Sequence, residues 1–90
     1  MKKTNIHLRM SIIQALQFLL INQRKGKDTS QNEFSRKCGL SRQYIAHVER
    51  GRRMPAFDFI FSIAEGFDMD IKDFMQMLVE KILYYKNLHK

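Results

Sequence analysis

Apolar residues recur along this chain at the three- and four-residue intervals that are typical of amphipathic α-helices. The pattern is clearest in residues 7–25 and 57–64, where one face of each predicted helix is apolar. The chain contains one proline and no alternating run of β-branched residues, which argues against strands. The pattern therefore predicts an all-α fold of five helices in a single domain, residues 1–90, with an extended C-terminal helix over about residues 71–88.

Two short helices joined by a tight turn are predicted in residues 31–50. Ser30 and Glu33 have the spacing of a capping box, so a helix is expected to begin directly after Ser30. Gly39 ends that helix, because glycine adopts the left-handed backbone conformation without a steric penalty from a Cβ atom. Ser41 then caps a second helix, which is expected to run to the end of this segment.

The second helix of this pair has one apolar face. At 100° per residue, Ile45 and Val48 share its inner side. The other positions are expected to point outward or to lie on the flanks: Arg42, Gln43, Tyr44, Ala46, His47 and Arg50. A helix with exposed Arg, Gln and His side chains, beside a second basic helix, has the chemistry to contact base edges in the DNA major groove.

The helix pair and the residues after it follow a known pattern. The matching positions are Gln31, Ser35, Gly39, Leu40, Ser41, Tyr44, Ile45, Val48, Glu49, Arg50, Gly51, Arg53, Pro55, Ile63, Ala64, Phe67, Asp70, Ile71 and Phe74. Over about Leu16–Leu78 the chain resembles the XRE family, the Cro and phage-repressor class of helix-turn-helix regulators. Within that family, its continuing last helix is similar to restriction–modification controller proteins, and small phage or conjugative-element repressors are equally compatible with the sequence. The resemblance implies a five-helix repressor-like DNA-binding domain.

The resemblance also implies which residues contact double-stranded DNA. Base edges are expected to be contacted by Arg42, Gln43 and His47. Arginine can pair bidentately with guanine, and glutamine can pair with adenine. Phosphate contacts position such a protein without specifying a sequence. The expected phosphate contacts are Gln31, Tyr44, Arg50, Arg52 and Arg53.

Further matching positions are structural. Ser35 is small enough for close contact between the two motif helices, and Gly39 makes the turn. Glu49 matches an acid that pairs with a basic residue of the first helix, for which Arg24 is the candidate. Asp68 departs from the family pattern, because it stands where glycine is common after the fourth helix, but aspartate tolerates the left-handed region better than most residues.

The positive charge of the chain is unevenly distributed. The net charge is +7, but residues 1–53 carry 12 Lys and Arg against 3 Asp and Glu, whereas residues 54–90 carry 4 against 6. The excess therefore coincides with the helix-turn-helix half. This polarity favours a domain that places one end on phosphate, with a solvated basic face as the alternative.

The C-terminal helix continues its apolar pattern beyond the part needed for a minimal domain. A second apolar face on a small domain usually marks a partner surface. The predicted dimer contacts are Leu78, Ile82, Leu83 and Tyr85, with Phe18 or Ile21 as support from the first helix. A homodimer on a palindromic operator follows from the resemblance. The alternative is that the last helix packs on the first within one chain.

No enzyme chemistry is predicted. The glycines form no phosphate-binding loop, and neither the histidines nor the cysteine have metal-ligand spacing. We therefore expect no cofactor, no metal and no small-molecule ligand. Cys38 has no disulfide partner and is expected to be a buried small hydrophobe. The longest apolar run, Phe18–Ile21, is too short for a membrane span, so a cytoplasmic protein of the bacterial nucleoid is expected.

Three other interpretations remain open at this stage. An antitoxin-type regulator would bind a toxin as well as DNA. A protein-interaction module on the same fold would have acidic or missing groove residues, which is the opposite of what this chain shows. A membrane-surface peptide would suit the basic N-terminus and the apolar first helix, but the helix-capping signals favour a full globular domain.

Overall fold

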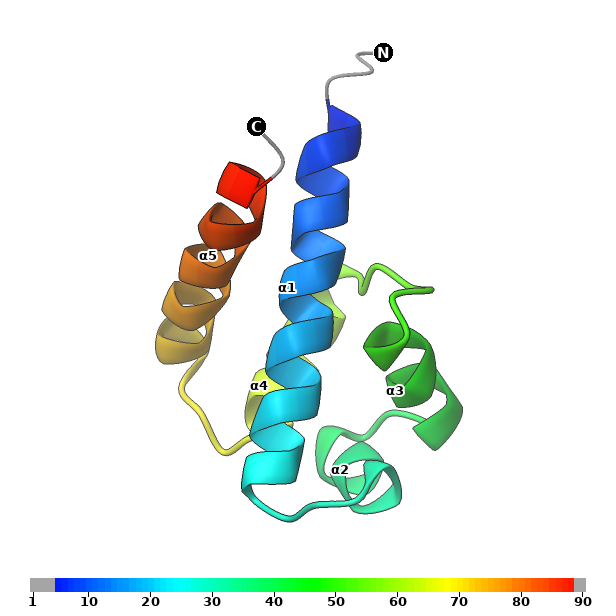
Figure 1. Cartoon of the computed structure of the whole chain (residues 1–90). Coiled ribbons are helices and arrows are strands. Elements are labelled where there is room, and N and C mark those ends of the chain that lie inside the picture. Colours follow the sequence, from blue (N-terminus) through cyan, green and yellow to red (C-terminus); the bar gives the residue numbers. More distant parts are fainter. Residues whose placement is uncertain (1–4, 89–90) are drawn as a thin grey trace.

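The computed structural model describes residues 5–88 of the 90-residue chain and contains five helices. These are α1 (Asn5–Gly26), α2 (Gln31–Cys38), α3 (Arg42–Glu49), α4 (Phe57–Gly66) and α5 (Ile71–Leu88). In Figure 1, α1 runs through the middle of the molecule, α5 lies along one side of it and α3 lies on the other. The predicted all-α fold class is confirmed. The basic N-terminal residues that entered the membrane-surface interpretation lie outside the described part.

The motif helices begin and end where local sequence chemistry predicts. The Ser30 hydroxyl accepts a hydrogen bond from the Glu33 amide at 3.0 Å, and the Glu33 carboxylate accepts one from the Ser30 amide at the same distance. Gly39 ends α2 in the left-handed conformation, with φ of 72°. The Ser41 hydroxyl caps α3 by accepting from the Tyr44 amide at 3.0 Å. The predicted helix-turn-helix geometry is therefore confirmed.

The ends of α1, α3 and α4 each show a particular backbone feature. α3 ends at Glu49, one residue early, because the next residue already has non-helical backbone angles. α4 begins at Phe57, two residues after Pro55. Asp28 and Asp68 both adopt positive φ, at 54° and 58°. Aspartate therefore takes the left-handed position expected at residue 68.

The core is built from aromatic and aliphatic residues of all five helices. Phe34 of α2 stacks against Phe67 with ring centroids 4.3 Å apart, and Phe67 lies 6.1 Å from Phe74 of α5. The core also includes Ala15, Leu16, Leu19, Leu20, Cys38, Ile45, Val48, Ile60, Ile63, Ala64 and Leu78. Within the predicted apolar face of residues 57–64, however, Phe57 and Phe61 remain exposed.

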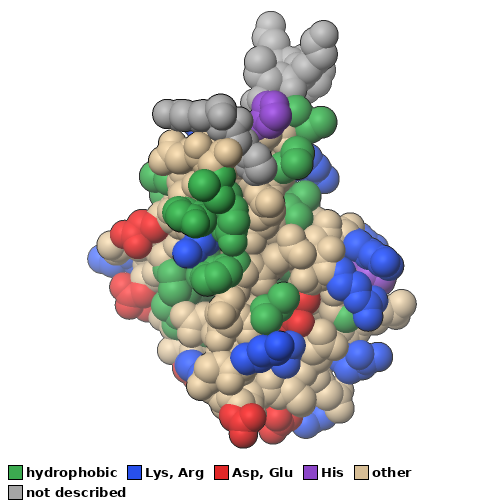
Figure 2. All heavy atoms as spheres, in the orientation of Figure 1, with side chains coloured by type: hydrophobic (Ala, Val, Ile, Leu, Met, Phe, Trp, Pro, Cys, Tyr) green, Lys and Arg blue, Asp and Glu red, His purple; other side chains and the backbone are tan. Residues whose placement is uncertain are grey.

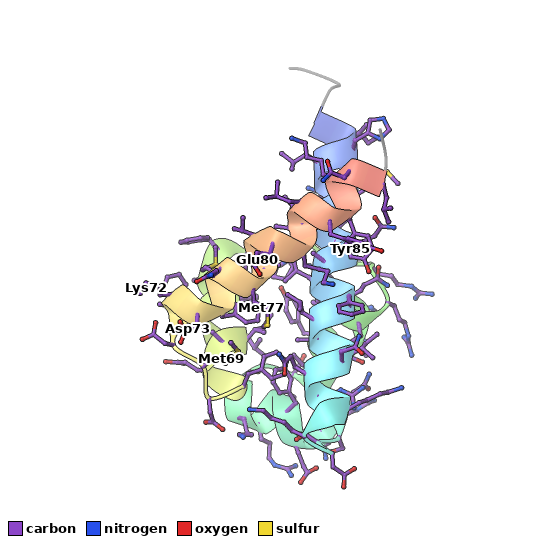
Figure 3. The ribbon with its side chains drawn as sticks, turned by 60° about the vertical axis from the view of Figure 1, so that its left-hand side comes forward. Met69, Lys72, Asp73, Met77, Glu80 and Tyr85 are labelled. Carbon is purple, nitrogen blue, oxygen red and sulfur yellow. The ribbon has the colours of Figure 1, made fainter. Side chains whose placement is uncertain are left out.

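α5 packs along α1, and this packing changes the expected partner surface. Leu78 is only 2% exposed and belongs to the core, so it is not available as a dimer contact, contrary to the prediction. Ile82 and Tyr85 are half-buried against the same core, and only Leu83 of the four predicted contacts is exposed. Figure 3 shows Tyr85 on the side of α5 that meets α1, with Lys72 pointing away from it.

Candidate nucleic-acid interface

The outer side of α3 carries the residues predicted to contact bases. Arg42 and Gln43 are exposed at the start of the helix, and His47 is half-buried one turn later. A shallow surface hollow of about 240 Å³ brings several of the predicted residues together. It is lined by Ser41, Gln43, Tyr44, His47 and Arg53. The structure thus places base-contact and phosphate-contact candidates on one continuous surface.

The loop after α3 extends this surface with positive charge. Arg50, Arg52 and Arg53 are all exposed. Gly51 has φ of 74°, and the Arg52 amide then donates to the His47 carbonyl at 2.9 Å, which turns the chain back beside α3. Figure 2 shows Lys and Arg side chains gathered on the side of the molecule where α3 lies. The uneven charge distribution counted in the sequence is therefore visible as a basic face beside α3.

Tyr44 is held in place by aromatic packing. Its ring lies edge-on to Phe59 with centroids 5.0 Å apart, and the Arg53 guanidinium lies 6.0 Å from the ring centroid. Burial raises the pKa of the Tyr44 hydroxyl above its usual value. The hydroxyl therefore stays protonated at neutral pH and is able to donate a hydrogen bond to a phosphate oxygen.

A buried ion pair attaches α3 to α1. The Arg24 guanidinium donates to both carboxylate oxygens of Glu49, at 2.7 Å from Nε and 2.9 Å from Nη2. Glu49 is 7% exposed, and the hydrogen bond to it raises the pKa of Arg24. Arg24 Nη1 also donates to the Thr29 carbonyl at 2.9 Å. The predicted pairing of Glu49 with Arg24 is confirmed.

Gln31, a predicted phosphate contact, makes two side-chain hydrogen bonds to other residues of the protein. Its Nε2 donates to Glu49 Oε1 at 2.9 Å, and its Oε1 accepts from Arg42 Nη1 at 3.4 Å. Ala46 is 5% exposed, so the expectation that it points outward is wrong. Ala46 and Glu49 are three residues apart and lie on the same helical face. Because both side chains are buried, the inner side of α3 is broader than the predicted apolar face.

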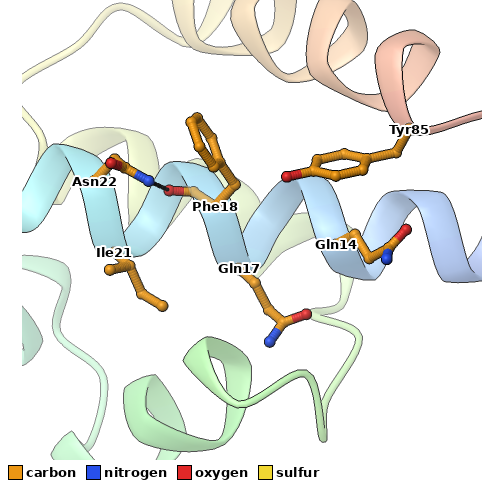
Figure 4. A pocket seen from close by; sticks show the side chains of 6 residues that line it. All are labelled: Gln14, Gln17, Phe18, Ile21, Asn22 and Tyr85. Carbon is orange, nitrogen blue, oxygen red and sulfur yellow. Dashed lines mark hydrogen bonds between the residues drawn. The ribbon is translucent and has the colours of Figure 1, made fainter. Parts of the chain in front are cut away.

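Gln17 of α1 contributes a contact that no sequence signal indicated. Its Nε2 donates to the backbone carbonyl of Glu49 at 3.1 Å, where the last turn of α3 leaves carbonyls without helical partners. A Cβ atom at Gly51 would lie only 2.9 Å from the Gln17 side chain. Figure 4 shows Gln17 reaching from α1 toward this turn, beside a groove that Phe18 and Tyr85 also line.

Two further findings concern metal binding and membrane spans within residues 5–88. No group of three or more His, Cys, Asp and Glu side chains in this range is arranged to hold a metal ion. In the same range, no helix has the length and hydropathy needed to cross a membrane. Cys38 is buried, as predicted, and burial raises the pKa of its thiol to about 12.

The family of the chain follows from comparison with known proteins. A helix-turn-helix family model matches residues 20–74, more than half of the sequence. The chain belongs to this XRE-type helix-turn-helix family, whose members are DNA-binding regulators. No curated protein sequence matches.

Solved structures with this fold include restriction–modification controller proteins, in agreement with the predicted resemblance. The wild-type controller protein C.Esp1396I has 26% sequence identity and a TM-score of 0.71, with 80% of this chain and 92% of that chain covered. The C.Esp1396I tetramer in complex with its natural 35 base-pair operator has 26% identity and a TM-score of 0.72, covering 80% and 95%. C.AhdI from Aeromonas hydrophila has 27% identity and a TM-score of 0.59, covering 73% and 94%.

Proposed function

We propose that this protein is a sequence-specific transcriptional regulator that binds double-stranded DNA as a homodimer on a palindromic operator. The observation that carries the proposal is the exposed start of α3. There, Arg42 and Gln43 project from a helix that is fixed to α1 by the Arg24–Glu49 ion pair. A rigid helix with such side chains suits the major groove, which distinguishes all four base pairs.

The surrounding surface supports a duplex as the ligand. Arg50, Arg52 and Arg53 supply exposed positive charge next to α3, and Tyr44 supplies a protonated hydroxyl. We assign phosphate contacts to these four residues and base contacts to Arg42, Gln43 and His47. C.Esp1396I, a protein of the same fold, has been solved in complex with its operator, which supports duplex DNA as the ligand. Such a regulator would act in the bacterial cytoplasm, at the nucleoid.

The homodimer is proposed to form through α5. Val79, Leu83, Tyr84 and Leu88 are between 45% and 61% exposed on this helix. At 100° per residue, Val79 and Leu83 share one face of the helix, while Tyr84 and Leu88 lie on another side. The exposed pair of Val79 and Leu83 is the proposed partner surface. A two-fold dimer would pair this surface with itself.

The proposal is tested by selecting binding sites from a random duplex library and titrating the selected site. We expect wild-type protein to select a two-fold symmetric sequence. Arg42→Ala should cost about 1–3 kcal/mol of binding free energy on that site and relax the preference at one position of each half-site. The proposal fails if the wild-type protein selects no sequence.

The matched control for this experiment is Arg52→Ala. If Arg52 contacts phosphate, its loss should weaken all sequences similarly and lower the salt slope of binding by about one unit. The base-contact assignment of Arg42 is wrong if both variants lose affinity without any change in sequence preference.

A further inference from the structure

A shallow groove of about 280 Å³ crosses the surface of α1 between α5 and the end of α3. Figure 4 shows Phe18 and Tyr85 on the α5 side of this groove and Gln17 and Ile21 on the α3 side. The remaining lining residues are Gln14 and Asn22. None of these six side chains is charged, and together they combine aromatic and aliphatic surface with amide groups. Such a combination is typical of small-molecule sites.

A lysine lies at the α5 edge of the groove. Lys81 Nζ is 4.2 Å from the centroid of the Phe18 ring and 5.1 Å from that of the Tyr84 ring. Neither of the two ion pairs within residues 5–88 includes Lys81, so no carboxylate of this part of the chain neutralises its charge. An ammonium group on aromatic rings, next to an uncharged groove, favours an anionic ligand with an aromatic body.

The opposite wall of the groove is connected to α3. Gln17 Nε2 donates to the Glu49 carbonyl at 3.1 Å, at the last turn of α3. A Cβ atom at Gly51 would lie 2.9 Å from the Gln17 side chain, so Gln17 also packs against the turn that leads into Arg52 and Arg53. A ligand that covers Gln17 excludes water from this hydrogen bond and restricts the rotamers of the side chain. Occupancy of the groove therefore favours the observed arrangement of α3 and the basic loop after it.

We propose that this groove is an effector site for a small aromatic carboxylate, and that its occupancy raises the affinity of the protein for its operator through Gln17. The ring of the ligand lies between Phe18 and Ile21, and its carboxylate pairs with Lys81. The volume is just below the ~300–1,000 Å³ typical of ligand sites, so the ligand is limited to one or two fused rings. The binding site stands independently, whereas the regulatory step rests on the proposed function and deepens it.

The groove is separate from the surfaces proposed for DNA and for the dimer. Lys81 and Leu83 are two residues apart on α5, so at 100° per residue they lie on nearly opposite sides of the helix. The residues proposed to contact DNA belong to α3 and the loop after it, and none of them lines the groove. A ligand can therefore reach the groove in a DNA-bound dimer, and its effect on DNA binding passes through Gln17.

Indole-3-acetate and its neutral counterpart indole-3-acetamide test the binding site on the intact chain. The chain contains no Trp, so the indole fluorescence of the probe reports binding directly. We expect a Kd of about 0.1–1 mM for indole-3-acetate, with the amide bound about fivefold more weakly because it lacks the charge that Lys81 attracts. Lys81→Gln should remove the preference for the acid. Lys86→Gln is the matched control on another side of α5 and should leave that preference unchanged.

Titration of the selected operator site tests the regulatory step. Saturating indole-3-acetate should raise operator affinity about threefold to tenfold, and the operator should raise the affinity for the probe by the same factor. Gln17→Leu removes the hydrogen bond to Glu49, so it should still bind the probe but lose this coupling. Circular dichroism checks that each variant is folded.

Absence of probe binding, or equal binding of the acid and the amide to the wild-type protein, would overturn the effector site. Probe binding that leaves operator affinity unchanged, or coupling that survives Gln17→Leu, would overturn the regulatory step while the proposed function stands. A wild-type protein that selects no DNA sequence would overturn the proposed function and the regulatory step together, and the fluorescence titration would still decide the binding site.

Discussion

At the scale of single residues, the carboxylate of Glu49 organises the surface around α3. Burying a charge costs free energy unless it is paired and hydrogen-bonded. Both oxygens of Glu49 accept bonds from Arg24, one accepts a further bond from Gln31, and its backbone carbonyl accepts from Gln17. One residue thus connects α1, α2 and α3, which explains how a short eight-residue helix is held rigidly.

We predict that Glu49→Ala lowers the free energy of unfolding by about 3–5 kcal/mol, because Arg24 is left as a largely buried, unpaired cation. Replacing both partners, as Arg24→Met with Glu49→Leu, should cost much less than Glu49→Ala alone. Urea unfolding followed by circular dichroism measures both. Asp68→Asn is the matched control, since it removes the exposed ion pair with Lys37, and it should leave the urea midpoint unchanged. If Glu49→Ala and Asp68→Asn lowered the free energy of unfolding equally, this account would be wrong.

The thiol of Cys38 gives a second prediction at this scale. Burial raises its pKa to about 12, so the thiol stays protonated in the folded protein. At about pH 8 it should react with Ellman's reagent far more slowly than a free thiol, because the thiolate is the nucleophile. Full reactivity should appear in concentrated guanidinium chloride. Rapid reaction of the native protein would place Cys38 at the surface instead.

At the scale of helices, local chemistry predicted the motif well, whereas the sequence could not decide how α5 packs and gave no signal for the Gln17 contact. The caps at Ser30 and Ser41 and the left-handed turn at Gly39 depend on residues a few positions apart. The burial of Leu78 depends on how α5 crosses α1, and the apolar pattern alone is the same for a core face and a partner face. The hydrogen bond from Gln17 depends on a residue 32 positions away, so no local pattern reveals it.

The turn between α2 and α3 should be sensitive to strain alone. A Cβ atom at Gly39 would meet nothing within 4 Å, but its φ of 72° is costly for a residue with a side chain. We expect Gly39→Ala to cost about 1–2 kcal/mol of unfolding free energy. Gly39→Val should cost more, because a β-branched residue tolerates positive φ poorly. Thermal unfolding measures both.

Gly26 provides the matched control for the turn. A Cβ atom at Gly26 would also meet nothing within 4 Å, but this glycine lies at the end of α1 without positive φ. Gly26→Ala should leave stability unchanged or raise it by up to about 1 kcal/mol. If the substitutions at Gly39 and Gly26 had the same effect, the assignment of strain to the turn would be wrong.

The contact between α2 and α4 should be sensitive to volume. A Cβ atom at Gly66 would collide with the Cys38 sulfur and lie 2.9 Å from the Phe34 ring. We predict that Gly66→Ala costs about 1–3 kcal/mol of unfolding free energy through overpacking. Because Cys38→Ala removes the sulfur, the double variant should be more stable than the sum of the two single losses predicts, as measured by urea unfolding. Strict additivity would contradict the collision.

At the scale of the whole molecule, the arrangement of helices constrains how two copies sit on DNA. A two-fold dimer must place its recognition helices about 34 Å apart, one turn of the duplex. The molecule measures 37 × 23 × 21 Å, and α1 lies between α3 and α5 (Figure 1). Contact through α5 would therefore leave both α3 helices outside the interface and free to meet DNA.

Exposed apolar residues offer two surfaces for that contact. Leu83 is 52% exposed on α5, while Phe57 and Phe61 form an exposed edge-to-face pair on α4 with centroids 5.3 Å apart. Ile82, one of the dimer contacts predicted from the sequence, is half-buried against the core, so a charge there would also disturb folding. Leu83 is therefore the sharper position for a substitution.

We predict that Leu83→Asp gives a folded monomer with severely weakened binding to a palindromic site. The substitution acts twice in a self-complementary interface, because each copy presents the new charge to the other. Sedimentation measures the oligomeric state, and titration of the palindromic and half-site duplexes measures affinity. Half-site binding should change little, since Leu83 lies on α5 and not on the basic face. Phe61→Asp is the matched variant. If Leu83→Asp stayed dimeric while Phe61→Asp became monomeric, the interface would lie on α4 instead of α5. A wild-type protein that stays monomeric at high micromolar concentration would exclude the homodimer itself.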